Sequence, residues 1–269
     1  MKNEIYTKEH LLYLSALRRK NIGVIFARFF ILALLLGIWE LAARLEWVNP
    51  FVTSSPSRIG KTLKDLYLAG TLFYHIRVTL SETLAGFFIA VIGGYLIALL
   101  LWWSESVRRT LEPYLVVINA LPKIALGPLV IIWFGTGSEA IVCMTVLVGI
   151  IVATMNMLNG FMSTDENKLL LLKSLGANKL QILTKLVVPS SLPAFISMLK
   201  ISVGMAWIGS IMGEYIVSKA GIGYLIVYGG QVFKLDLVMA SVFVLCVLAA
   251  GMYAVVAAIE KFCLKGRGN

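Results

Sequence analysis

Long apolar stretches alternate with short charged segments along the chain. Three stretches carry no charged residue: Thr83–Ser104, Ala140–Thr164 and Leu237–Ile259. Three more contain charges inside or near one end: about Val24–Leu45, Pro113–Gly137 and Ser190–Tyr215. Each reaches the roughly 20 mostly apolar residues that a helix needs to cross a bilayer. Backbone amides in hydrocarbon must bond within their own segment, so the pattern predicts six transmembrane helices. Glu40 interrupts the first.

The connection between the first two predicted spans, about Glu46–His75, predicts a helix of a different kind. After Pro56 the apolar residues recur at helical spacing, at Ile59, Leu63, Leu66 and Tyr67. Residues spaced in this way share one face of a helix. We therefore expect a short amphipathic helix that lies on the outer membrane surface.

The connection Ser163–Pro189 predicts two short helices separated by a turn. Ser163 and Glu166 have the spacing of a capping box, which begins the first helix at the next residue or two. Gly176 can end that helix because glycine readily adopts the left-handed conformation found at helix C-termini. The first helix holds four leucines in a row, Leu169–Leu172, which is more apolar surface than one packed face needs. An exposed apolar patch of this kind marks a partner surface, whereas the ordinary alternative is a loop packed on its own bundle.

The second short helix begins at Asn178, because Gln181 follows three residues later. Pro189 limits it at the other end. Its apolar residues are expected to form one stripe: Leu180, Leu183 and Val187.

Composition and charge agree with a membrane protein. Of the 269 residues, 59% are hydrophobic and 14% are charged, whereas soluble domains carry about 25% charged residues. The mean hydropathy is +0.88. The net charge of +10 is spread between apolar blocks rather than gathered in a basic run, so nucleic acid is not an expected partner. Placing the N-terminus in the cytoplasm puts 17 of the 24 Lys and Arg residues inside, so we expect both termini to be cytoplasmic.

Residues for catalysis or metal binding are scarce. Three cysteines and two histidines occur, without a CxxC pair or metal-ligand spacing. The chain has no Gly-x-x-x-x-Gly-Lys-Ser/Thr phosphate loop, so it does not bind ATP by that device. We expect no enzyme activity, no metal and no cofactor in this chain.

Three segments resemble a known family: Arg109–Gly137 (RTLEPYLVVINALPKIALGPLVIIWFGTG), Lys173–Pro193 (KSLGANKLQILTKLVVPSSLP) and Trp207–Ile226 (WIGSIMGEYIVSKAGIGYLI). They are similar to the membrane-spanning permease subunits of bacterial ABC importers of type I, in the group for nitrate, sulfonate, taurine, bicarbonate and thiamine precursors. Gly176 matches the glycine of that family's coupling motif, and Leu192-Pro193 or Pro189 matches its end. Where the motif usually has Glu-Ala-Ala, this chain has Leu170-Leu171-Leu172, so any polar contact of that glutamate is in doubt.

The resemblance implies an all-α membrane fold with six spans, the type I importer permease bundle. It also implies the partners: a second permease copy that completes the path in a homodimer, a cytoplasmic ABC ATPase dimer that binds the ATP, an external substrate-binding protein, and the lipid bilayer of the cell membrane. The chain then divides into a cytoplasmic N-terminal segment (1–23), a transmembrane permease domain (24–262) with cytoplasmic coupling helices (163–189), and a cytoplasmic tail (263–269). The residues expected to contact the ATPase are Leu170, Leu171, Leu172, Gly176, Ala177 and Leu180.

Polar residues at membrane depth are candidates for the translocation path, because burying them in lipid costs several kcal/mol. Lys123 follows Pro122 where two prolines break the third span, and broken helices often line substrate paths. Lys123 would attract an anion there, or would instead extend to the cytoplasmic interface. The full set of candidates is Asn119, Pro122, Lys123, Asn156, Trp207 and Glu214. The asparagines serve equally well as helix-to-helix contacts, and Glu214 as an interfacial residue.

The expected function is import of a small nutrient, either a sulfonate-, taurine- or nitrate-like anion or a thiamine-precursor-like heterocycle. Two alternatives from other classes are an ion-coupled secondary transporter and a membrane scaffold or sensor without transport. A secondary transporter would favour paired buried carboxylates or an inverted repeat, and neither is clear in this sequence.

Overall fold

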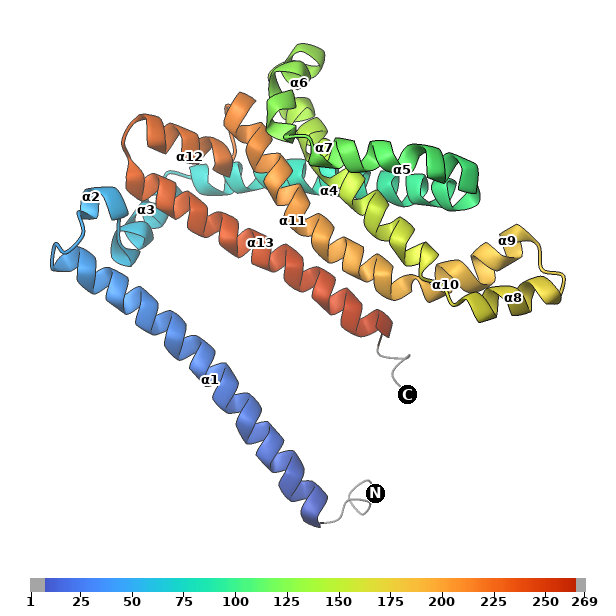
Figure 1. Ribbon diagram of the computed structural model, residues 1–269. Coiled ribbons are helices and arrows are strands. Elements are labelled where there is room, and N and C mark those ends of the chain that lie inside the picture. Colours follow the sequence, from blue (N-terminus) through green and yellow to red (C-terminus); the bar gives the residue numbers. More distant parts are fainter. Residues whose placement is uncertain (1–7, 265–269) are drawn as a thin grey trace. The chain divides into compact units, whose positions relative to one another are not determined.

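The structure is a computed structural model that describes residues 8–264 (Figure 1). Residues 1–7 and 265–269 lie outside the described part. The expected N-terminal segment (1–23) and tail (263–269) therefore each fall partly outside it. The regular structure of the described residues is entirely helical. Internal contacts divide the chain into two units, residues 1–64 and residues 65–269.

The first unit contains α1 (Lys8–Arg44), α2 (Pro50–Thr53) and most of α3 (Pro56–Leu68). α1 includes an apolar stretch, Ile22–Arg44, that is long enough to cross a membrane. The charges at its end are matched within this unit. One carboxylate oxygen of Glu40 accepts from Arg44 at 2.8 Å, and the other accepts the backbone N–H of Ser57 at 3.0 Å. α3 is the amphipathic helix that the sequence predicts.

The second unit contains the remaining candidate spans. Four are single long helices: α4 (Thr71–Trp103), α7 (Ser138–Met162), α11 (Leu192–Val217) and α13 (Leu235–Leu264). A further span is broken: α5 (Glu105–Ala120) meets η1 (Lys123–Leu126) and α6 (Gly127–Phe134) at a bend of 89°. The predicted six spans agree with the structure when this bent pair counts as one span.

Close packing of α4, α7 and α11 depends on residues without large side chains. A Cβ atom built on Gly209 would lie 2.6 Å from the Cα of Thr145, and one on Gly213 would lie 2.9 Å from the Cα of Ile141. A Cβ atom on Gly94 would lie 2.7 Å from the Cβ of Ala153. Small residues at such contacts let helix backbones approach in membranes. The glycines at these contacts therefore allow the three helices to pack closely, whereas Gly204 faces open space.

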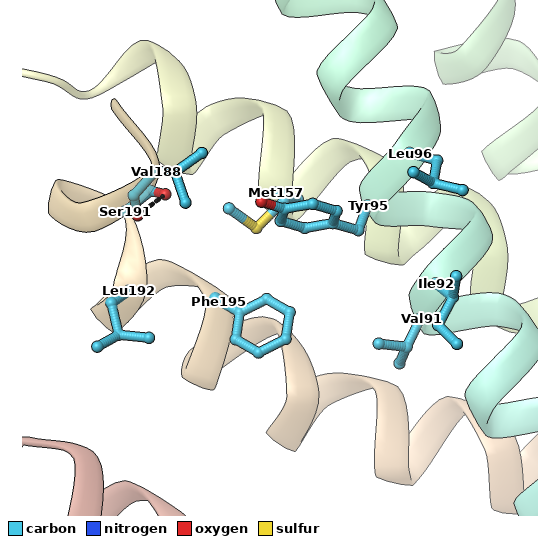
Figure 2. A pocket seen from close by; sticks show the side chains of 9 residues that line it. All are labelled: Val91, Ile92, Tyr95, Leu96, Met157, Val188, Ser191, Leu192 and Phe195. Atoms are coloured by element: carbon cyan, nitrogen blue, oxygen red, sulfur yellow. Dashed lines mark hydrogen bonds between the residues drawn. The ribbon is translucent and has the colours of Figure 1, made fainter. Parts of the chain in front are cut away.

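An apolar cavity of about 370 Å³ lies among α4, α7, α11 and the short helix α10 (Val188–Ser190). Figure 2 shows the rings of Tyr95 and Phe195 and the side chain of Met157 around it. The ring of Tyr95 meets those of Phe161 and Phe195 edge-on, with centroids 5.6 and 5.8 Å apart. The cavity therefore lies where the connection between α7 and α11 joins the bundle.

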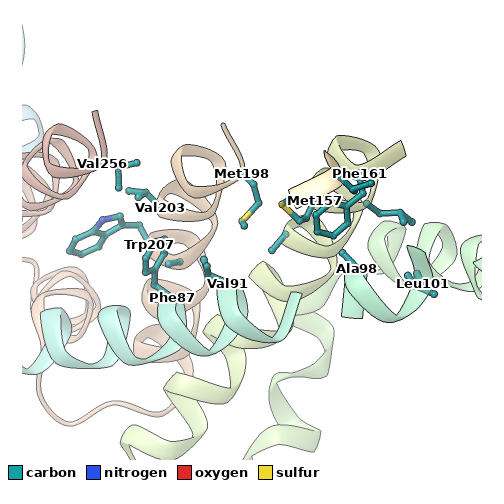
Figure 3. Close-up of a cluster of buried hydrophobic side chains, with 14 of the residues drawn as sticks. Phe87, Val91, Ala98, Leu101, Met157, Phe161, Met198, Val203, Trp207 and Val256 are labelled. Carbon is teal, nitrogen blue, oxygen red and sulfur yellow. The ribbon is translucent and has the colours of Figure 1, made fainter. Parts of the chain in front are cut away.

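The hydrophobic core of this unit extends along the same three helices (Figure 3). Phe161, Met157 and Met198 are each no more than 1% exposed. Trp207 of α11 belongs to the same cluster, beside Val203 and Val256. α11 thus has its packing partners on α4, α7 and α13.

One helix boundary and one additional helix differ from the sequence expectation. α4 begins at Thr71, twelve residues before the predicted start at Thr83, because its first turns carry polar residues that an apolar window rejects. A ten-residue helix, α12 (Ile222–Gln231), was not predicted, since it is too short to appear as a span. It lies between α11 and α13 in the chain.

Candidate functional site

The chain between α7 and α11, residues 163–191, is called here the α7–α11 connection. It contains α8 (Glu166–Ser174), α9 (Lys179–Ile182), a π-helical turn η2 (Leu183–Val187) and α10. Figure 1 shows it at the end of α11 opposite to α12. Its two-helix form agrees with the sequence prediction, but several of its details do not.

The N-terminal cap of α8 is Asp165, whose side chain accepts the N–H of Asn167 at 2.9 Å. The predicted capping box at Ser163 is wrong. The hydroxyls of Ser163 and Thr164 donate to carbonyls in the last turn of α7, those of Gly160 and Phe161, at 2.9 Å each. Asp165 is therefore the first side-chain acceptor free to cap the next helix.

The C-terminus of α8 ends as predicted. Gly176 has φ of +78°, in the left-handed region. Its N–H donates to the carbonyl of Lys173, and the N–H of Ala177 donates to the carbonyl of Leu172, both at 3.0 Å. This pair of bonds is a Schellman motif, which satisfies carbonyls that the helix end leaves free. The turn therefore needs a residue that tolerates positive φ.

The second helix begins with the predicted capping box. Asn178 accepts the N–H of Gln181 at 2.8 Å, and Gln181 accepts the N–H of Asn178 at 2.9 Å. Pro189 does not limit the helical chain as expected, because it lies in the first turn of α10, where no helical N–H is required. Only Ser191 separates α10 from α11, so helical structure runs almost without interruption from Lys179 into the bundle.

The leucines of the α7–α11 connection face in two directions. Leu169 and Leu172 pack against the hydrophobic core. Four others are largely exposed, and we call them the exposed leucines: Leu170 (62%), Leu171 (59%), Leu175 (72%) and Leu180 (58%). The predicted stripe of the second helix is wrong for Leu180, since Ile182 and Val187 are the residues buried there.

The connection is tied to α4 by Lys179. The Nζ of Lys179 donates to the carbonyl oxygen of Trp103, in the last turn of α4. It also lies 5.4 and 5.9 Å from the ring centroids of Trp103 and Trp102. A cation is stabilised both by a helix C-terminus and by the face of an indole ring. α9 therefore bonds directly to a span that is distant in sequence.

Asn119, Pro122 and Lys123 come together at the break between α5 and η1. The Nζ of Lys123 donates to the backbone carbonyl of Asn119 and lies 3.4 Å from its side-chain oxygen. The lysine thus caps the C-terminus of α5, where a positive charge is favoured. Its ammonium group is turned back toward its own broken helix.

A second cavity, of about 520 Å³, lies next to this break among η1, α11 and α13. Its lining is uncharged and includes Ile124, Ile208, Met212 and Tyr215. Trp207 also lines it, and the Nε1–H of that ring has no hydrogen-bond partner within the described residues. Such a donor beside an apolar cavity is a common feature of small-molecule sites.

Asn156 and Glu214, the other two path candidates, have local partners. The side-chain amide of Asn156 donates to the carbonyl of Val152, one turn earlier in its own helix, at 2.8 Å. Glu214 is 1% exposed, near the end of α11 remote from the α7–α11 connection. Its Oε2 accepts the N–H groups of Gly223 at 2.6 Å and Tyr224 at 3.2 Å. Glu214 therefore caps the N-terminus of α12.

Two residues of α4 complete that cap, and sequence reasoning missed both. The hydroxyl oxygen of Thr79 accepts the N–H of Ile222 at 2.7 Å, and Nδ1 of His75 accepts the N–H of Gly221 at 3.0 Å. Gly221 has φ of +113° and no side chain, so α12 has no cap of its own. An N-cap glycine before an apolar run was the available signal, but it does not name distant partners.

Several long apolar helices, a span broken near a cavity, and a helical connection with exposed leucines together define the membrane-spanning subunit of a multi-component transporter. The chain belongs to the family of binding-protein-dependent transport system inner membrane components, whose model matches residues 86–263. It is the permease subunit of an ABC importer and a multi-pass membrane protein. This confirms the expected class and sets aside the secondary transporter and the scaffold.

Two relatives are similar to this chain in sequence, and one solved structure is similar to it in fold. The chain is 33% identical to the formylaminopyrimidine transport permease protein ThiX of Halalkalibacterium halodurans, over 87% of this chain and 93% of the relative. It is 27% identical to the taurine transport system permease protein TauC of Escherichia coli, over 81% of each. A subunit of a bacterial ABC transporter involved in import of the acidic polysaccharide alginate has the same fold, with a TM-score of 0.65 at 15% identity over 93% of this chain and 95% of that one.

Proposed function

We propose that the α7–α11 connection faces the cytoplasm and receives the importer's ATPase, and that two copies of this chain form one translocation path. Both termini are then cytoplasmic, and a substrate-binding protein delivers its cargo from outside. The observation that carries the proposal is the set of exposed leucines. α8 already has a packed face in Leu169 and Leu172, so Leu170 and Leu171 are available to a partner.

The replacement of Glu-Ala-Ala by leucines fits an apolar contact with the ATPase. Burying a leucine side chain is worth about 1.5–3 kcal/mol, which is more than an exposed ion pair contributes, at about 0–1 kcal/mol. A groove on the ATPase that accepts Leu170, Leu171 and Leu180 would therefore replace the polar contact of the usual glutamate.

Movement of the connection has two routes into the membrane. α10 leads into α11 with only Ser191 between them, and Lys179 bonds to the end of α4. The same three-helix packing joins α4 and α11 through α7. A displacement imposed by ATP binding on α8 and α9 would be transmitted as a rigid movement of the bundle, which exchanges access between the two sides.

The substrate proposed for this path is a neutral, planar heterocycle of the thiamine-precursor kind. The cavity of about 520 Å³ next to the broken span has an uncharged lining, with the Trp207 indole N–H as a donor for a ring nitrogen or carbonyl. Lys123, which would attract an anion, is occupied by the C-terminus of α5. The relative at 33% identity is named for formylaminopyrimidine transport, whereas the taurine permease is 27% identical.

Uptake by proteoliposomes tests these assignments. The permease is reconstituted with its ATPase and its binding protein, and ATP-driven uptake of labelled formylaminopyrimidine is compared with that of taurine. We expect the pyrimidine to be taken up, and Trp207→Phe to reduce that uptake roughly fivefold to tenfold through loss of one hydrogen bond. Trp133→Phe, at an exposed tryptophan outside the cavity lining, serves as the control. Preferred uptake of taurine, or equal uptake by wild type and Trp207→Phe, would reject the heterocycle assignment.

The orientation has its own test. In a cysteine-free background, Leu171→Cys is treated in intact cells with a thiol reagent that does not cross membranes. We expect no labelling until the cells are opened, and protection when the ATPase is bound. Labelling from outside would exclude the proposed docking of the ATPase at α8.

A further inference from the structure

A groove of about 510 Å³ separates the α7–α11 connection from the turn that joins α4 to α5. Its lining is amphipathic. The apolar part is made by Trp102, Met162, Leu169, Ala177 and Ile182, and the charged part by Glu105, Arg108, Lys173 and Lys179. Five helices contribute: the ends of α4 and α7, the start of α5, and the two short helices α8 and α9 of the connection.

The positive charge of this groove is incompletely matched. The side chain of Arg108 is 21% exposed, and its one ion pair among the described residues is with Glu112 at 3.6 Å. That distance exceeds the 2.7–3.2 Å of an ordinary hydrogen bond. By contrast, Arg109 is 74% exposed and bonds to Glu105 at 2.5 Å, so the groove's acidic residue is already paired. A largely buried guanidinium without a close acceptor points to an anionic ligand.

The two lysines of the groove differ in the contacts they make within the described residues. Lys179 bonds to the carbonyl of Trp103 and lies over two indole rings. Lys173 is exposed in the last turn of α8 and lines the same groove as Arg108. Arg108 and Lys173 therefore both present cationic groups to this groove, and the guanidinium of Arg108 has the fork geometry that binds phosphate.

We propose that this groove binds the phosphate headgroup of an anionic phospholipid from the surrounding bilayer. Tryptophans at the end of a span mark the level of the headgroups, and Trp102 is part of the apolar floor on which the glycerol and first acyl carbons would lie. Basic pockets between transmembrane helices on the cytoplasmic side have this chemistry. The leaflet assignment rests on the proposed function, which places the connection in the cytoplasm.

The lipid would add a second link between the α7–α11 connection and the bundle. Lys179 joins α9 to α4. A phosphate held by both Arg108 and Lys173 joins α8 to the start of α5, the first half of the broken span. An anionic lipid therefore stiffens the coupling between the ATPase-facing helices and α5, whose other end is capped by Lys123.

Lipid retention by the purified importer tests the site without ATP or substrate. The complex is equilibrated with equal phosphatidylglycerol and phosphatidylcholine, and bound lipid is counted by native mass spectrometry. We expect phosphatidylglycerol to be retained, with affinity falling about fivefold for each charge removed in Arg108→Gln and Lys173→Gln, as about 1 kcal/mol per basic residue implies. Matched controls are Lys168→Gln on α8 and Lys185→Gln on η2, exposed lysines that do not line the groove.

The alternatives give different results. Equal loss of lipid in all four variants would mean a diffuse surface charge, and equal retention of phosphatidylcholine would mean an apolar contact only; either overturns the proposal. Displacement of the lipid by millimolar inorganic phosphate would identify a soluble anion instead. Cross-linking of Lys173→Cys to the ATPase, with no lipid retained, would assign the groove to the protein partner. Because lipid binding is measured without uptake, an importer that fails to transport pyrimidine can still pass this test, so the two proposals fail separately.

Discussion

The two ends of α11 differ in how the neighbouring short helices are capped and in which side chains are left without a packing partner. At one end, the N-terminus of α12 is capped by Glu214, Thr79 and His75, all supplied by the same unit. At the other end, α8 and α9 are capped by their own residues, but they leave the exposed leucines without a packing partner. At the first end, the backbone N–H groups that begin α12 are bonded within the subunit. The second has apolar surface that only another molecule can cover.

This difference separates residues that stabilise the folded permease from residues that couple it to its partner. A side chain that satisfies a buried group inside the subunit contributes to the folded state, whereas a side chain that waits for a partner contributes to assembly. Mutations at the α12 end should therefore lower the stability of the purified permease, and mutations of the exposed leucines should leave it unchanged while abolishing transport. Four substitutions test this difference, and their expected effects on the free energy of unfolding decrease from Glu214 to the exposed leucines.

The largest effect is expected for Glu214→Ala. It leaves the buried N–H of Gly223 and the partly buried N–H of Tyr224 without an acceptor, at a cost of about 3 kcal/mol. Thermal unfolding of the purified permease in detergent, followed by tryptophan fluorescence, measures the loss. Glu214→Gln keeps one acceptor oxygen and should lose about half as much. A midpoint equal to that of wild type for Glu214→Ala would remove the contrast between the two ends of α11.

A smaller effect is expected for Gly176→Val at the turn after α8. A built Cβ atom at Gly176 meets nothing within 4 Å, so the cost comes only from the positive φ. For a β-branched residue this is roughly 1–2 kcal/mol, and the Schellman turn should open locally, which lowers ATP-driven uptake at equal amounts of inserted protein. Gly176→Asn is the matched variant, because asparagine tolerates the left-handed region better. Equal uptake by the valine and glycine forms would show that this turn does not carry coupling.

Whether a structural feature of this protein can be predicted from the sequence depends on how far apart the interacting residues are along the chain. The spans, the amphipathic helix α3, the capping box at Asn178 and the turn at Gly176 were predictable, because each depends on residues within a few positions. The Ser163 cap was mispredicted, since α7 runs up to that residue and uses its hydroxyl. No local pattern indicates how far a preceding helix extends.

Contacts between distant segments were not predictable. Glu214 was assigned to the path or to the interface, yet its partners lie on α12, a helix that the apolar pattern did not include. Lys123 was expected to act on a substrate or to reach the interface, and its observed partner is the carbonyl of Asn119, freed where Pro122 breaks the span. In both cases a free helix terminus determines where the charge lies, and the sequence alone did not locate that terminus correctly.

Lys123→Ala should destabilise the permease less than Gly176→Val. Loss of a cation from the C-terminus of α5 should cost about 0.3–1 kcal/mol. Pyrimidine uptake should be nearly unchanged, whereas an importer of an anion would lose uptake when this charge is removed. Lys123→Arg retains the charge and should behave as wild type. The same uptake assay measures all three proteins, and a marked loss of pyrimidine uptake in the alanine variant would give Lys123 a direct role in the path.

The smallest effect on unfolding is expected for the double variant Leu170→Ser, Leu171→Ser. Both side chains are about 60% exposed, so the free energy of unfolding should change by less than about 0.5 kcal/mol. Binding of the ATPase in a pull-down and ATP-driven uptake should both be lost. Leu172→Ser is the reverse control, because Leu172 packs against the core and its loss should destabilise the permease. Normal ATPase binding by the double variant would show that the exposed leucines serve another purpose.

The near-contact of backbones at Gly209 and Gly213 has a mechanical consequence. At these two glycines the backbone of α11 approaches that of α7 without intervening side chains, so the two helices resist sliding past each other. α7 and α11 therefore move together as one rigid pair. A displacement applied at α10 would tilt both helices together. α12, which Glu214 holds at the far end of α11, would move with them.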